Sequence, residues 1–268
     1  MKNLSESDFV ILIDMSYFIF YRYFALIHWW KLAKPEEELV DPSTNKDFRN
    51  KFIKTFYEKI NEIPKKLKLK NYTIIAAKDT QRNLIWRKEL FKQYKEQRIL
   101  DDEFMGGPFF EIAYNKLIIS DICPILSLDR LEADDCIALY SKSIREKYPD
   151  KKIIIIANDM DYLQIADESI SIINLKYKNL QDSKNSTKNK DCDLFCKIVL
   201  GDKSDNIPGI FKKCGPKTAV KYFENKELFE KALQKENAYE QFEFNKKIIS
   251  FNEIPLELQQ LFAIKHPI

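Results

Sequence analysis

Three carboxylates are crowded into "LEADD" (131–135), at the start of an apolar, helix-patterned segment that continues to Lys142. Glu132, Asp134 and Asp135 stand close together along the chain, and like charges at that spacing repel each other. Packing alone does not favour such an arrangement. Either water solvates these side chains on an outer face of the protein, or a cation makes their crowding favourable.

Further acidic residues follow short apolar runs that have the composition of buried strands. Asp14 directly follows the first run, and Asp79 follows the second. Asp159 and Asp161 follow the fourth. The runs span residues 9–13, 72–77, 123–126, 153–157 and 169–175.

Long helical patterns lie between these runs, for example over residues 46–63 and 133–147. Strands that alternate with helices predict an α/β fold with a mostly parallel, doubly wound sheet. In such sheets ligands bind at the carboxyl ends of the strands, where the loops converge. We therefore expect the acids of four separated segments to meet at one edge of the sheet.

The acidic set as a whole indicates a metal site. Asp and Glu often cap helices and populate loops, and any single residue of the set is explained as well in that way. Several carboxylates at one edge would be costly without cations, however. All are hard oxygen ligands, without His or Cys, which favours Mg²⁺ or Mn²⁺ over zinc. Two such ions about 3.5–4 Å apart can stabilise both oxygens of phosphodiester hydrolysis.

A second informative stretch is "GDKSDNIPGIFKKCGPKTAVKYF" (201–223). It carries Asp202 and Asp205, then a turn at Gly209, and it opens a helix at 215–218. Exposed N–H groups at such a helix start bind phosphate, and Lys217 adds a point charge. The alternative is an ordinary helix–turn–helix with a solvated lysine.

Helical spacing also marks "IWRKELFKQYKEQR" (85–98). One stripe consists of Lys88, Lys92 and Lys95, and another of Arg87, Phe91, Tyr94 and Arg98. Basic and aromatic side chains on one helix suit a nucleic-acid strand. An amphipathic helix that turns Phe91 and Tyr94 toward the core explains the pattern equally well.

Composition sets outer limits on function. The 268 residues carry a net charge of only +3, but residues 78–98 hold seven Lys/Arg against three Asp/Glu, and residues 212–226 hold five against one. Such basic islands suggest contact with a polyanion. Five cysteines without a CxxC pair and only two histidines argue against zinc. We find no signal peptide and no apolar run of membrane-spanning length, and expect a soluble intracellular protein without a membrane partner.

Together the motifs resemble the 5′-nuclease superfamily of flap endonucleases, phage 5′–3′ exonucleases and the nuclease domain of bacterial DNA polymerase I. The resemblance runs through "LIDMSYFIFYR", "AKDTQRNLIWRKELFKQYKEQR", "LEADD", "IIIIANDMDYLQI" and "GDKSDNIPG…GPKTA". It implies a PIN-like nuclease core over residues 1–180 with a helical arch at about 80–108. A flexible loop over 181–191 and a helical region over 192–268 with a helix–three-turn–helix would follow.

The resemblance also implies the activity: metal-dependent, structure-specific 5′–3′ exonuclease or flap endonuclease cleavage of DNA in replication or repair. It implies two Mg²⁺ ions, for which Mn²⁺ can substitute, and a K⁺ at the helix–three-turn–helix. The expected substrate is DNA with a 5′ end or flap beside duplex, or an RNA–DNA hybrid. A monomer is expected, with a sliding clamp or single-strand-binding protein as a partner.

Matching positions carry the family's roles onto this chain. The first metal site would consist of Asp14, Asp79, Glu132 and Asp134. The second would consist of Asp159, Asp161 and Asp205, with Asp134 shared and with Asp135 and Asp202 as further acidic positions. Lys95 and Arg98 match the catalytic basic pair at the scissile phosphate. DNA contacts are expected from Arg22, Arg87, Lys88, Lys92, Tyr94, Gly209, Gly215, Lys217 and Thr218.

Two positions depart from the family pattern. The usual Gly-x-Gly turn is Lys213-Cys214-Gly215, in a loop about one residue longer, which affects the phosphate and K⁺ contacts. Lys78 stands before Asp79 where relatives often have an apolar residue, and the sequence offers no reason for it.

Two other functions stay compatible with parts of the pattern. A toxin-type ribonuclease can have a similar acidic edge, but such chains are generally shorter and lack the element at 209–218. A non-catalytic DNA-structure-binding homologue would be expected to have lost metal ligands, and none of the seven is missing. RNase H-like removal of RNA primers by the same site remains open.

Overall fold

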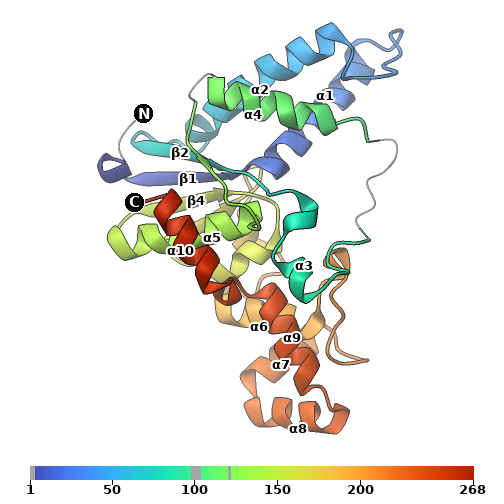
Figure 1. Cartoon of the computed structure of the whole chain (residues 1–268), viewed down its shortest axis with the longest axis vertical. Helices are drawn as coiled ribbons and strands as arrows, with labels where there is room; N and C mark the ends of the chain where they lie inside the picture. The colour runs from blue at the N-terminus through green and yellow to red at the C-terminus, as the bar shows by residue number, and fades with distance from the viewer. Residues whose placement is uncertain (1–3, 98–103, 120–121) are drawn as a thin grey trace.

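The computed structural model describes residues 4–97, 104–119 and 122–268. Its centre is one five-stranded sheet in the order β3-β2-β1-β4-β5, in which every neighbouring pair is parallel (Figure 1). The strands are β1 (Phe9–Asp14), β2 (Tyr72–Ala77), β3 (Ile125–Leu126), β4 (Lys152–Ile156) and β5 (Ile170–Ile173). The predicted parallel α/β fold is confirmed.

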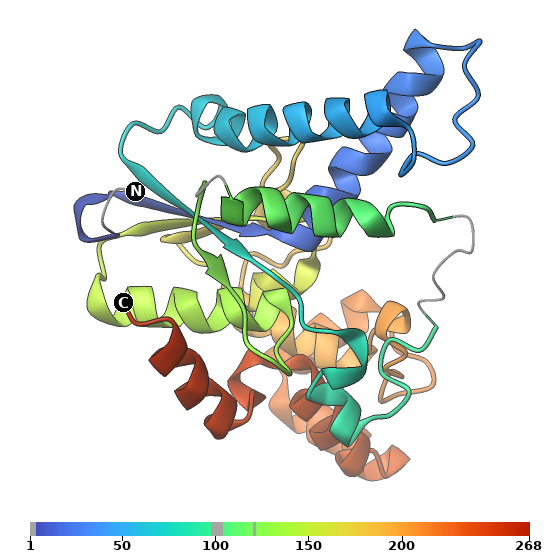
Figure 2. The ribbon, with the colours of Figure 1, turned by 45° about the horizontal axis from the view of Figure 1, so that its top comes forward.

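Helices cover both faces of the sheet (Figure 2). Ile11 and Ile13 of β1 pack with α1 (Met15–Ala33), α2 (Lys46–Lys66) and α4 (Gly107–Ile119). Val10 and Leu12 point to the other face. There they pack with α5 (Ala133–Lys147) and α10 (Leu256–Lys265). Because successive side chains of a strand alternate between faces, one apolar run supplies both cores.

The remaining helical elements are short. They are η1 (Leu4–Glu6), η2 (Arg82–Leu84), α3 (Arg87–Leu90), η3 (Met160–Ile165), η4 (Leu180–Asp182), α6 (Lys190–Leu200), η5 (Lys203–Asp205), α7 (Pro216–Glu224), α8 (Lys226–Glu236), α9 (Tyr239–Ile249) and η6 (Phe251–Glu253). Across the described part of the chain, each helix is too short or too polar to cross a lipid bilayer.

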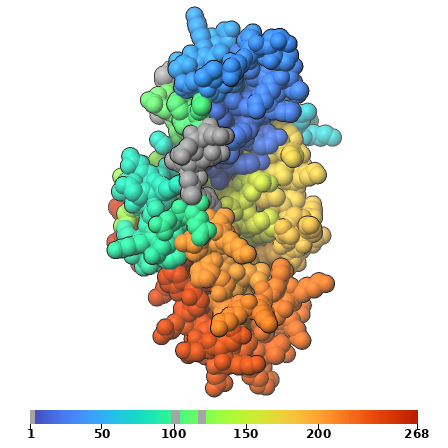
Figure 3. All heavy atoms as spheres, turned by 90° about the vertical axis from the view of Figure 1, so that its right-hand side faces the viewer, coloured from blue at the N-terminus to red at the C-terminus, as the bar shows by residue number. Residues whose placement is uncertain are grey.

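Helices α6 to α9 form a lower portion of the molecule with an apolar cluster of its own, in which Val199, Ala219 and Phe229 are buried (Figure 3). The chain leaves α6 through Gly201, whose φ of +70° is unfavourable for other residues. A Cβ there would lie 2.5 Å from backbone atoms of Ile207 and Pro208. This tight turn brings η5 back beside the end of α6.

The prediction of a helix over residues 85–98 is wrong over most of its length. Among the described residues of this range only α3 is helical. Phe91 has an extended backbone, and residues 92–97 form turns. Phe91 and Tyr94 pack into a cluster with isoleucines of α6 and α9. The amide of Lys95, at φ +56°, donates to the carbonyl of Asp205. These tertiary contacts are incompatible with a continuous helix.

The segment predicted as a flexible loop at 181–191 has defined local structure. It begins within η4, and α6 already starts at Lys190, where Asn189 caps the helix through its side chain. The carboxylate of Asp193 accepts hydrogen bonds from the Thr187 amide and the Ser186 hydroxyl. Part of the expected arch, residues 98–103, lies outside the described residues.

Candidate active site

Five of the predicted acids line one cavity of about 540 Å³ at the carboxyl ends of the strands. Asp14 ends β1, Asp79 follows β2, and Asp159 follows β4. Glu132 and Asp134 stand at the start of α5, on the same cavity. Ser16, Arg82 and Lys95 contribute the neighbouring polar wall. The sheet therefore brings together acids that are up to 145 positions apart in the sequence.

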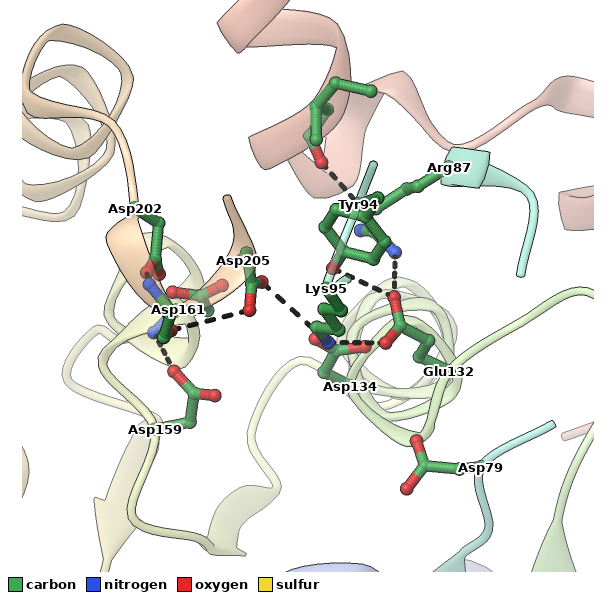
Figure 4. Close-up of polar contacts among 12 residues, drawn as sticks. Asp79, Arg87, Tyr94, Lys95, Glu132, Asp134, Asp159, Asp161, Asp202 and Asp205 are labelled. Atoms are coloured by element: carbon green, nitrogen blue, oxygen red, sulfur yellow. Dashed lines mark hydrogen bonds and ion pairs between the residues drawn. The ribbon is translucent and has the colours of Figure 1, made fainter. Parts of the chain in front are cut away.

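Two groups of carboxylates are compact enough to hold a cation. One oxygen from each of Glu132, Asp134 and Asp135 lies within 4.8 Å of the others, and the same holds for Asp161, Asp202 and Asp205. In Figure 4 the two groups stand side by side, with Lys95 between Glu132 and Asp205. Lys95 Nζ lies 2.5 Å from Glu132 Oε1 and 3.8 Å from Asp205 Oδ2.

Asp135 is a structural anchor within the first group. Its Oδ1 accepts a hydrogen bond from Arg87 Nη2 at 2.7 Å. Its Oδ2 accepts from Arg87 Nη1, from Trp86 Nε1 and from the Glu132 amide at 2.8–3.1 Å. The side chain is fully buried. With both oxygens bonded by protein groups, Asp135 holds the start of α5 in place, whereas Asp134 faces the cavity.

Arg87 and Tyr94 lie in the interior, which corrects their prediction as DNA contacts. They are 2% and 3% exposed. Arg87 bonds Glu132 and Asp135 and donates through Nε to the Ile248 carbonyl. The hydroxyl of Tyr94 donates to Glu132 Oε2 at 3.1 Å. Both residues fix Glu132 and do not face solvent. Burial alone would lower the pKa of Arg87, but the neighbouring Asp135 and Glu132 raise it above the ordinary value.

Asp14 and Asp79 are oriented by hydrogen bonds from three elements. Asp14 accepts from the Tyr17 amide at 3.1 Å, as the cap of α1, and from the Tyr162 hydroxyl at 3.0 Å. Asp79 accepts from the Ala133 amide at 2.7 Å and from the Ser16 hydroxyl. These contacts link the ends of β1 and β2 to the start of α5.

The cavity disfavours bare negative charge. Burial, together with the charge of Asp79, raises the pKa of Asp14 to about 7. Burial likewise raises the pKa of Asp79 and, with Glu132 and Asp135 beside it, raises that of Asp134 well above the ordinary value. Carboxylates with raised pKa values that line one cavity fit divalent cations as their counter-charge.

We expect the metal-free protein to become less stable as the pH rises from about 4 to about 7. Asp14, Asp79 and Asp134 have folded-state pKa values above the unfolded value of 3.8, so the folded state binds more protons. Their contribution is complete below that value and is lost as the pH rises through each folded-state pKa, which for Asp14 is about 7. Thermal melts in a chelator should give a Tm roughly 5 °C lower at pH 8 than at pH 5. Saturating Mg²⁺ should remove this decline; a flat profile in chelator would contradict it.

Two acids of the second group form ion pairs with one lysine, which the sequence analysis did not predict as a site residue. Lys197, on α6, forms ion pairs with Asp161 and Asp202, the latter at 2.8 Å. Despite the cost of burial, Lys197 and the Ser204 contacts lower the pKa of Asp202 to about 2. The helical pattern of 190–200 does not distinguish Lys197 from a solvated lysine, so only its partners from other elements identify it.

Three further basic residues predicted as DNA contacts lie among the described residues. Lys92 is exposed, Lys88 is half-buried, and Arg22 is half-buried on α1 near Tyr21 and Glu62. Arg98 lies outside the described residues. These placements leave the roles of Lys88, Lys92, Arg22 and Arg98 as predictions.

The helix predicted to open at 215–218 is present as α7. Gly215 caps α7, Pro216 is its first residue, and Lys217 is exposed while Thr218 is partly so. Gly209 is required for packing, because a Cβ would lie 2.8 Å from the Leu200 carbonyl oxygen. Gly215 faces open space. An exposed α7 N-terminus with Lys217 is therefore available to an anion.

Lys78, for which the sequence offers no reason, contacts an aromatic ring. Its Nζ lies 4.6 Å from the ring centroid of Tyr114, on α4, in a cation–π contact. The phenol of Tyr114 is buried, and burial together with the charge of Asp79 raises its pKa. This lysine, in place of an apolar residue, therefore packs against the ring of Tyr114.

Comparison with known proteins agrees with this geometry. A 5′-3′ exonuclease of Mycoplasmopsis pulmonis is 29% identical over 98% of this chain and 88% of its own length. Ribonuclease H of bacteriophage T4 is 26% identical, over 71% and 68% of the two chains. The bacteriophage T5 flap endonuclease, solved with DNA and metal ions, superposes with a TM-score of 0.67 at 15% identity, over 96% and 97%.

At 15% identity the structural match establishes a shared fold. The sequence evidence is more specific. Residues 9–192 match the family described as the 5′-3′ exonuclease, N-terminal resolvase-like domain. Because that match covers more than half of the chain and spans the cavity-lining acids from Asp14 to Asp159, this protein belongs to the 5′–3′ exonuclease family of nucleases.

Proposed function

We propose that this chain is a structure-specific 5′ nuclease that hydrolyses DNA bearing a 5′ end or flap beside a duplex, with two Mg²⁺ ions. The observation that carries the proposal is the meeting of acids from four chain segments on one cavity, with Lys95 between the two acidic groups. Mn²⁺ can replace Mg²⁺ in such an all-oxygen set. We expect a monomer that acts inside the cell at sites of DNA synthesis.

The roles that we propose for the acids are those implied by the family resemblance. Asp14, Asp79, Glu132 and Asp134 would hold the first ion. Asp159, Asp161 and Asp205 would hold the second, with Asp202 beside them. When bound, such ions stabilise charge on phosphoryl oxygens and lower the pKa of water. Asp135 and Arg87 fix Glu132 from behind, and Tyr162 and Ser16 orient Asp14 and Asp79.

Lys95 supplies positive charge where a phosphate would enter the cavity. Its ammonium lies on the cavity wall between the two acidic groups. A cation there offsets the charge that develops on the scissile phosphate. Arg98, three residues further along the chain, is proposed as the second member of this basic pair from the family resemblance.

Duplex binding is proposed for the start of α7. The exposed N-terminus of α7 and Lys217 lie in a segment that also exposes Lys212, Lys213 and Lys221. The T5 flap endonuclease shares the fold and was solved with DNA, which supports a DNA substrate. A K⁺ ion at the turn before α7 is part of the same proposal, as is a clamp or single-strand-binding partner.

We expect Lys217→Ala to weaken duplex binding several-fold without changing the fold, because one phosphate contact is lost. The slope of log K against log salt should become shallower by about 0.9. Fluorescence anisotropy with labelled duplex at several salt concentrations measures both values. Lys265→Ala, an exposed residue of α10, is the control. An unchanged slope in Lys217→Ala would remove this lysine from the interface.

An RNA–DNA hybrid is the second candidate substrate. The similarity to a protein named ribonuclease H favours it. A cleavage assay decides between the substrates: 5′-labelled flap, blunt duplex and hybrid are compared with and without Mg²⁺. We expect flap cleavage that requires the metal. Cleavage of the hybrid alone would favour the second candidate, and no metal-dependent cleavage of any substrate would refute the proposal.

A further inference from the structure

Each acidic group contains an ammonium from the protein itself. Lys95 Nζ contacts Glu132 at 2.5 Å and lies 3.8 Å from Asp205. Lys197 Nζ forms ion pairs with Asp161 and, at 2.8 Å, with Asp202. The two lysine side chains are only 12% and 19% exposed. Neither is a solvated surface charge.

Tertiary contacts hold both lysines close to the acids. Helix α6 packs against η3, so Lys197 faces Asp161. The turn at Gly201 then returns the chain so that Asp202 reaches the same ammonium. Lys95 is held by its own amide, which donates to the Asp205 carbonyl at 3.1 Å. Three separate segments therefore determine where these two charges stand.

We propose that Lys95 and Lys197 are resident counter-ions of the two acidic groups, and that divalent ions bind by displacing their ammonium groups. The inference rests on the proposed function, because it takes Glu132 of the first group and Asp161 and Asp205 of the second as metal ligands. A divalent ion and an ammonium require the same oxygens, and Mg²⁺ needs them at about 2.0–2.1 Å. Two cations cannot share them at that distance without strong repulsion.

This arrangement has two consequences for the protein. Without metal, the lysines offset part of the repulsion among buried carboxylates, which stabilises the fold. With metal, each ammonium is released on a flexible stem beside the cavity, where an incoming phosphate presents negative charge. Lys197 thereby becomes a positioning residue for metal entry and a second basic group at the site, next to Lys95.

The test measures metal affinity without DNA, so that no turnover is involved. Mn²⁺ is titrated into the full-length protein, and free Mn²⁺ is followed by electron paramagnetic resonance. Lys95→Met and Lys197→Met keep most of the side-chain stem and remove the charge. We expect each to bind Mn²⁺ about tenfold more tightly, since each loses a positive charge that repels the metal ion and competes for the same oxygens. Lys203→Met, exposed on η5 between Asp202 and Asp205, should stay within about twofold of wild type.

Thermal melts guard against misfolded variants. In chelator, Lys197→Met should melt below wild type, and saturating Mn²⁺ should raise its Tm by more than that of wild type. A variant that melts low even with Mn²⁺ would show the lysine to be structural support only, and would overturn the inference. So would affinity equal to or weaker than wild type. Failure of wild type itself to bind Mn²⁺ would instead refute the metal dependence of the proposed function.

Discussion

Replacing Asp134 by Asn should abolish cleavage and at the same time raise the Tm of the metal-free protein. The carboxylate faces the cavity, and burial beside Glu132 and Asp135 raises its pKa well above the ordinary value. An amide of the same shape removes a charge that the fold tolerates poorly. It also removes an anionic metal ligand, for which we expect at least about a 10³-fold loss of kcat, or roughly 4 kcal/mol.

A loss of cleavage together with a higher Tm separates this effect from misfolding, which would lower both. Cleavage of a 5′-labelled flap in Mg²⁺ measures the first, and thermal melting in chelator measures the second. Asp129→Ala, an exposed acid just before the same motif, should change neither. Asp159→Ala should likewise lose cleavage. Turnover within about tenfold of wild type in Asp134→Asn would remove this residue from the metal site.

The largest effect on stability is expected from Arg87→Met, which should lower the free energy of unfolding by about 3–5 kcal/mol. Arg87 is 2% exposed and bonds both Glu132 and Asp135. Without it, two buried carboxylates face each other with no guanidinium between them. The Ile248 carbonyl also loses its donor. Urea unfolding in chelator measures the change.

Arg130→Met is the matched control for Arg87. Arg130 also bridges two acids, Glu89 and Glu257, but those partners are exposed. Exposed pairs of this kind contribute less than about 1 kcal/mol. A similar small loss in Arg87→Met, accompanied by weaker DNA binding, would restore the interpretation of Arg87 as a surface contact.

The buried network around Arg87 and the two lysines makes the candidate site one unit. Arg87, Tyr94 and Lys95 all come from the segment after η2, and all three contact Glu132. Lys95 also reaches the second group through Asp205. The base of the expected arch is therefore part of the wall that orients the acids, in addition to any contact that it makes with a nucleic acid.

Much of the fold and of the acidic set followed from local sequence. The five apolar runs became the five strands, and the helix predicted at 133–147 has those bounds in α5. The reason is that burial of an apolar run and the capping box of Glu132 with Asp135 act over a few residues. The carboxyl ends of parallel strands then place acids at one edge, whatever the details of packing.

Only the tertiary structure decided which charged residues face the cavity and which support it from behind. Residues 85–98 have a helical pattern, but Tyr94 packs against α6 and α9, and Lys95 bonds Asp205. Arg87 has partners 45 to 161 positions away, and the partners of Lys197 come from η3 and from the turn after α6. A basic side chain in a helical pattern looks the same whether it meets solvent or a buried carboxylate. The difference lies in desolvation and in partners that only the folded chain brings within reach.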